Sequence, residues 1–184
     1  MKHILAVVAG IFAATPAITG VAHADALPKF EHVVARTYEP QSMPMADRVI
    51  VRKGERRLYL MRGDRILRSY NIRLGLNPVG HKERSGDFRT PEGTYRLTRR
   101  NPNSEYFLSI QVSYPNEEDK RRARANGWDA GGAIMIHGLP NQPRHPPEYY
   151  EKRDWTDGCI AVSNSDMVEI WLLTPDNVPI EIHP

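Results

Sequence analysis

The sequence is poor in cysteine, in long apolar runs and in net charge, and each shortage excludes a class of protein. Cys159 is the only cysteine among 184 residues, so no internal disulfide can form. Lysine and arginine outnumber aspartate and glutamate by only 25 to 22, with both signs mixed along the chain, so we expect no nucleic-acid partner. No apolar stretch reaches the length of a membrane span. No long repeat is present, and the length suits one domain with a real core.

The N-terminal end has the pattern of a secretory signal peptide. Lys2 supplies a positive charge, residues 4–14 form a short apolar run, and Ala22-His23-Ala24 is a small-x-small cleavage site. We therefore predict a signal peptide over residues 1–24 and an exported protein. Residues 25–46 contain three prolines without sustained periodicity, so we interpret them as a lead-in segment before a domain over residues 47–184.

The remaining pattern predicts a mainly β fold with a few peripheral helices. Alternating apolar residues from Asp47 onward, then residues 58–61 and 66–74, indicate three strands of an antiparallel meander. Further strands are expected at residues 94–98, 107–112, 133–136, 160–162 and 178–182. Two helices are expected, at 116–127 and 165–173, the second capped at Asn164-Ser165. The proline-rich segment between His137 and Trp155 is expected to be irregular.

Cys159 lies at the corner between a loop and a short apolar strand. Gly158 precedes it, and glycine permits a tight turn and a close backbone approach. A free cysteine often packs as a small hydrophobic residue, and intermolecular pairing is a second explanation. In an exported protein, however, an unused thiol is a liability, which favours a functional role.

His137 ends another apolar strand, 22 residues before Cys159. If the two strands are neighbours, the imidazole can take the thiol proton, support a thiolate and later protonate a leaving amine. The backbone N–H groups of Gly158 and Cys159 would then hold the oxyanion. A structural histidine at a strand end is the competing interpretation.

Three separated motifs resemble the catalytic domain of the YkuD-type L,D-transpeptidases, bacterial enzymes with a cysteine nucleophile. In chain order they are the Thr-Pro-x-Gly turn at residues 90–93, His137-Gly138 after an apolar strand, and Thr156-Asp157-Gly158-Cys159-Ile160 followed by Asn164. The resemblance covers roughly residues 47–183 and implies a β-sandwich-type catalytic domain. It also implies catalytic roles for Cys159 and His137, with Gly158, Asp157 and Gly138 supporting them.

Two positions depart from the family pattern. Asp157 replaces a histidine, and it would either attract a substrate ammonium or shape the turn. Ala161 replaces an arginine, a loss that Arg144 or Arg153 of the spacer would offset, with Trp155 beside them as a further substrate-binding candidate. The aspartate variant resembles a branch that includes an enzyme releasing the major outer-membrane lipoprotein from peptidoglycan. That branch can hydrolyse rather than cross-link.

The resemblance implies acyl transfer on peptidoglycan stem peptides in the periplasm or cell envelope of a bacterium. Cys159 would form a thioester at a diaminopimelate residue. An amine would resolve it into a cross-link or an anchored lipoprotein, whereas water would cleave the bond. No metal or organic cofactor is implied. A zinc site of His137, His145 and Cys159 matches no usual ligand spacing. An inactive module that binds the envelope is the non-catalytic alternative.

Overall fold

The computed structural model describes residues 43–184. The predicted signal peptide and most of the predicted lead-in lie outside the described residues. The described chain joins the domain at Ala46, which is buried and whose N–H donates to the carbonyl of Leu173 at 2.8 Å. No helix within residues 43–184 is long and apolar enough to cross a membrane.

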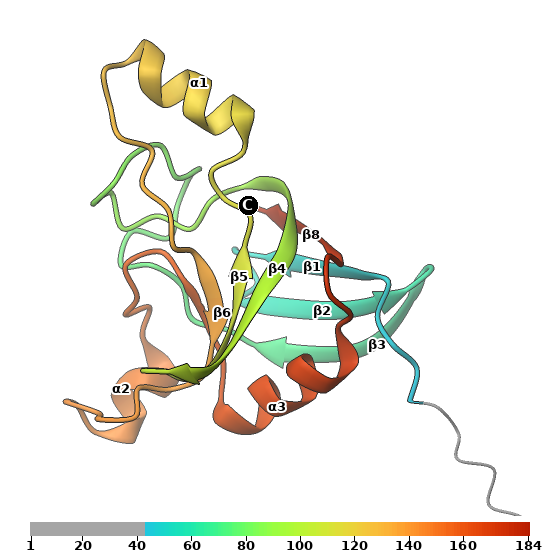
Figure 1. The fold of residues 1–184 in the computed structure, drawn as a ribbon. Helices are drawn as coiled ribbons and strands as arrows, with labels where there is room; N and C mark the ends of the chain where they lie inside the picture. Colours follow the sequence, from blue (N-terminus) through green and yellow to red (C-terminus); the bar gives the residue numbers. More distant parts are fainter. Residues whose placement is uncertain (1–42) are drawn as a thin grey trace, which may run out of the picture. The chain divides into compact units, whose positions relative to one another are not determined.

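The first three strands form the expected antiparallel meander (Figure 1). They are β1 (Arg48–Arg52), β2 (Arg57–Arg62) and β3 (Arg65–Asn71). In β1, Val49 and Val51 are fully buried while the intervening side chains reach solvent, as strict alternation requires. The third strand was expected to run to residue 74, but it ends at Asn71, and the chain then bridges to another part of the sheet.

The eight strands of the described part of the chain form one continuous sheet in the order β3-β2-β1-β8-β4-β5-β6-β7. The remaining strands are β4 (Gly93–Ser104), β5 (Phe107–Val112), β6 (Met135–His137), β7 (Ile160–Ala161) and β8 (Pro179–His183). The first part of β4 pairs with β8 and the later part pairs with β5, so β4 belongs to both halves of the sheet. The strands at the two ends of this order are β3 and β7. An antiparallel bridge between Arg73, two residues after β3, and Ala161 of β7 connects these two ends.

Within residues 43–184, three helices lie around this sheet. Helix α1 (Glu117–Ala125) is capped by Asn116 and is mostly exposed, as its charged sequence predicts, and Figure 1 shows it apart from the strands. Helix α3 (Asn164–Leu173) packs Met167, Ile170 and Leu173 into the core and contacts β5 and β6. The expected mainly β class with peripheral helices is therefore confirmed.

Two local predictions about helices were wrong. The spacer was expected to be irregular, yet it contains helix α2 (Pro147–Lys152), because Pro147 occupies the first helical turn, where its missing N–H costs nothing. The cap of α3 was expected at Asn164, but the Ser163 side chain accepts from the Asp166 N–H at 3.1 Å. Asn164 is therefore free to make a contact elsewhere.

Candidate active site

Strand pairing brings the two candidate catalytic residues together. Strands β6 and β7 are parallel neighbours, with Ile136 opposite Ile160 and His137 opposite Ala161. Cys159 directly precedes β7, and alternation places it on the same face as Ala161 and hence as His137. Both side chains line one cavity of about 480 Å³. The expected neighbouring strands are therefore present.

The turn before the thiol is held by Thr156 and requires glycine at position 158. The Thr156 hydroxyl donates to the Cys159 carbonyl at 2.7 Å and accepts from the Gly158 N–H at 3.2 Å. Gly158 has a φ of +130°, and a Cβ there would lie 2.6 Å from the Arg89 carbonyl oxygen. The Gly158 N–H therefore already has its acceptor, the Thr156 hydroxyl, within the turn. The Cys159 amide has no acceptor within residues 43–184, which leaves it as the candidate oxyanion donor.

The Cys159 thiol is held by two backbone groups of the neighbouring segment. The Met135 N–H donates to Sγ at 3.4 Å, and the Ala133 carbonyl accepts from the thiol at 3.5 Å. Burial raises the thiol pKa above its usual value, the Met135 N–H opposes this shift, and the Asp157 carboxylate adds to it. The resting thiol is therefore protonated at neutral pH.

His137 is oriented by a backbone carbonyl. Its Nδ1 lies 2.7 Å from the Gly138 oxygen, and because a carbonyl can only accept, Nδ1 carries the proton and Nε2 keeps its lone pair. The side chain is buried, and burial lowers the pKa of His137 to about 4, although the Gly138 contact opposes the shift. The imidazole is therefore neutral at pH 7 and able to accept a proton.

The Asn164 side chain supports this orientation. Its Oδ1 accepts from the Leu139 N–H at 2.8 Å and lies 2.5 Å from where a Gly138 Cβ would be. The Gly138 N–H in turn donates to the Tyr106 carbonyl at 3.1 Å. Asn164 thus fixes the backbone that carries the carbonyl partner of His137, and glycine at 138 allows the close approach.

An aromatic cluster covers the imidazole. The Tyr106 and His137 ring centroids are 4.6 Å apart, and the Trp155 ring meets the imidazole edge-on at 5.7 Å. Tyr150 of α2 packs edge-on against Trp155 at 5.1 Å. The Nε1–H of Trp155 is buried without an acceptor among the described side chains and backbone, so it remains available to a bound carbonyl.

The sequence comparison decides the family. Residues 46–182 match the family YkuD, described as the L,D-transpeptidase catalytic domain. The chain belongs to the YkuD family. Over 145 residues it is 36% identical to YafK of Escherichia coli (strain K12), which carries the provisional name of an L,D-transpeptidase; the match covers 75% of this chain and 51% of YafK. The chain thus spans about half the length of the curated relatives that it matches.

Solved structures agree with this assignment. The helical cell shape determining protein Pgp2 of Campylobacter jejuni is 28% identical with a TM-score of 0.55, and the match covers 73% of this chain and 46% of Pgp2. The L,D-transpeptidase of Mycobacterium smegmatis is 12% identical with a TM-score of 0.50 over 74% of this chain and 58% of that one, which shows a common fold.

The other predicted site residues do not all line the cavity that holds Cys159. Trp155 and Asp157 line the cavity that holds Cys159, and Asp157 is exposed with no hydrogen bond to its carboxylate within residues 43–184. The turn is therefore shaped by Thr156 rather than by Asp157. Arg144 lines a neighbouring aromatic cavity of about 530 Å³, whereas Arg153 is exposed and lies 5.7 Å from the Tyr149 ring centroid.

Sequence reasoning missed Tyr106, which lines both of these cavities. It lies in the short connection between β4 and β5, far from the Cys and His motifs in the chain. The only local signal was an aromatic residue at a hairpin tip, which no motif links to His137.

Proposed function

We propose that this YkuD domain transfers acyl groups of peptidoglycan stem peptides through a thioester on Cys159. The observation that carries the proposal is the pairing of β6 with β7, which places a protonated thiol and a neutral imidazole with a free Nε2 on one cavity. This is the combination that nucleophilic acyl transfer requires. The proposed location is the cell envelope, because the predicted signal peptide would export the protein.

The proposed first step couples proton transfer to attack. The thiol proton moves to His137 Nε2 while the Sγ–C bond to the substrate carbonyl forms, and the Cys159 N–H stabilises the oxyanion. The C–N bond then breaks, and the imidazolium gives its proton to the leaving amine. A second amine attacks the thioester, forms a new amide and returns the proton to the thiol. The buried Trp155 N–H offers a further hydrogen bond to the bound peptide.

The substrate class is supported by the family and by the relatives. Domains of the family are L,D-transpeptidases, and Pgp2 is named for cell shape, which fits a cell-wall polymer as substrate. The proposed acyl donor is a stem peptide cleaved at the L-centre of a diaminopimelate residue. A lipoprotein linked to that residue is a further proposed partner.

The test combines nucleophile variants with product analysis. The protein is incubated with purified muropeptides, and products and protein adducts are measured by mass spectrometry. Cys159→Ala is expected to abolish both the adduct and turnover, and Cys159→Ser to be almost as inactive, because a hydroxyl beside the same imidazole is far less ionised. Full activity in the alanine variant would exclude thiol catalysis.

Hydrolysis is the second candidate, and Ala161 favours it. This side chain is buried and apolar, so the position provides no anchor for a substrate carboxylate. A loosely held acceptor would compete poorly with water for the thioester. New diaminopimelate cross-links would exclude a pure hydrolase. Released monomers or lipoprotein without new cross-links, even at high acceptor concentration, would exclude the transferase.

A further inference from the structure

Arg73 forms no direct ion pair with any side chain of residues 43–184. None of the ion pairs in this part of the chain includes its guanidinium. Nη1 donates only to the adjacent Ile72 carbonyl, at 2.7 Å, and Nε is buried without an acceptor. A buried N–H normally has a hydrogen-bond acceptor, so the Arg73 Nε–H is available to an acceptor atom of a bound ligand.

The sheet register places Arg73 on the catalytic face. Arg73 and Ala161 exchange both backbone hydrogen bonds, each 2.8 Å long, and Ala161 is opposite His137 on the other side. Paired residues point to the same face of a sheet, so the three side chains form one row. Arg73 and His137 are therefore two strand spacings apart, about 10 Å between Cα atoms.

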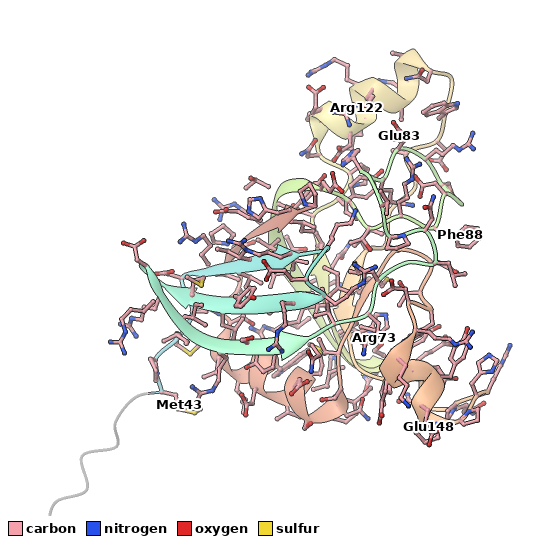
Figure 2. The ribbon with its side chains drawn as sticks, turned by 180° about the vertical axis from the view of Figure 1, so that it is seen from behind. Met43, Arg73, Glu83, Phe88, Arg122 and Glu148 are labelled. Atoms are coloured by element: carbon pink, nitrogen blue, oxygen red, sulfur yellow. The ribbon has the colours of Figure 1, made fainter. Side chains whose placement is uncertain are left out.

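Next to Ala161 is a cavity of about 390 Å³, which is lined by Arg73, Ala161 and Tyr150 but by neither His137 nor Cys159. Tyr150 also lines the aromatic cavity beside the catalytic one, and its ring packs against Trp155. Figure 2 shows Arg73 between the end of β3 and helix α2. Because Tyr150 packs against Trp155, which lines the cavity that holds Cys159, a substrate bound at Cys159 would reach the guanidinium by passing these two rings.

The cavity also presents two carboxylates. Glu151 comes from α2 and Asp166 from the first turn of α3, and both line it. Neither forms an ion pair with a side chain in the described range. A simple anion would be repelled by them, and a simple amine would be repelled by Arg73. A group with a carboxylate and an ammonium on one carbon satisfies both signs at once.

We propose that this cavity is a subsite for a free α-amino-acid group of the substrate. The carboxylate binds Arg73, and the ammonium faces Glu151 and Asp166. The inference rests on the proposed function, in which the reacting residue is diaminopimelate. That diamino diacid has one centre in the reacting bond and a second, free α-amino-acid centre at the end of a short methylene chain. Cys159 precedes Ala161 by two residues, so it is about 8 Å from Arg73 between Cα atoms, a span that such a side chain covers.

The deciding experiment measures binding without turnover. The Cys159→Ala protein is titrated calorimetrically with free diaminopimelate, with its carboxyl-amidated analogue and with D-alanine. Diaminopimelate is expected to bind. Adding Arg73→Met, which keeps volume and removes the charge, is expected to weaken binding about 10- to 100-fold, the effect of losing a charge-assisted hydrogen bond. The amidated analogue is expected to bind weakly to both proteins.

The control is Arg65→Met, an exposed arginine at the start of strand β3 that lines none of the cavities described above. It is expected to leave binding unchanged, and circular dichroism checks that each variant is folded. Unchanged diaminopimelate affinity in the folded Arg73→Met protein would overturn the subsite. Equal, Arg73-dependent binding of D-alanine would support the amino-acid chemistry and assign the cavity to an amino-acid acceptor. Binding is measured in the Cys159→Ala protein and does not require the thiol. Evidence against thiol catalysis would therefore leave the binding result unchanged.

Discussion

Removing His137 is expected to change how the stability of the domain depends on pH. The pKa of this buried imidazole is lowered from 6.5 to about 4, whereas in the unfolded chain it returns to its ordinary value. Between these two pH values the unfolded chain binds a proton that the folded protein excludes. Stability from this residue is therefore complete above about pH 6.5 and is lost as the pH falls toward 4. At about pH 4.5 the expected loss is roughly 2.5 kcal/mol, because one pKa unit corresponds to about 1.4 kcal/mol.

The assay is urea unfolding of the wild-type and His137→Gln proteins at about pH 7.5 and about pH 4.5, followed by tryptophan fluorescence. Other groups titrate in both proteins, so the comparison uses the difference between their acid-induced losses. The wild type is expected to lose about 2.5 kcal/mol more than the variant. His183→Gln, which removes an exposed histidine, is the matched control and should behave like the wild type. Equal losses in wild type and His137→Gln would refute the buried neutral imidazole.

Three other variants test the turn and the supports of the site. Asp157→Asn should lower the pKa of the Cys159 thiol, because a carboxylate that opposes the thiolate is removed; iodoacetamide alkylation at fixed pH should become faster. Gly158→Ala should destabilise the domain by roughly 2–4 kcal/mol in thermal unfolding, since its φ of +130° and the nearby Arg89 carbonyl exclude a Cβ. Asn164→Ala should leave one backbone amide unpaired, cost about 1–3 kcal/mol and reduce kcat; unchanged kcat would contradict its positioning role.

The strands were predictable where burial alternates along the chain. Val49 and Val51 lie on one face, whereas Arg48, Ile50 and Arg52 lie on the other, and this period of two predicts both the strand and its buried side. The later part of β4, from residue 99 to 104, was not expected, because its polar sequence contains Pro102 and has no apolar alternation. It is a strand because β5 pairs with it, a tertiary effect that local pattern does not encode.

The candidate site was predictable only where its residues belong to motifs. His137 and Cys159 follow apolar runs that become paired strands, so sequence order and chemistry suffice to connect them. Tyr106 and Arg73 reach the same face from a hairpin tip and from the end of the meander. Their placement depends on how the sheet closes through the Arg73–Ala161 bridge, which pairs residues 88 positions apart in the sequence. The spacing within a motif carries no information about such a contact.

In the mechanism that we propose, the burial of His137 and the partial burial of Cys159 explain why the thiol is unreactive at rest and reacts only with a bound substrate. The same desolvation that raises the pKa of Cys159 lowers that of His137, so the resting pair is uncharged rather than an ion pair. A protonated thiol reacts slowly with oxidants and disulfides, which protects the only cysteine in the exported location that we propose. The cost is that charge must develop during attack. In the proposed mechanism, proton transfer to Nε2 therefore accompanies formation of the Sγ–C bond, and the Cys159 N–H is the proposed donor to the oxyanion. The proposed mechanism thereby confines the reactivity of Cys159 to the moment when a substrate carbonyl is bound.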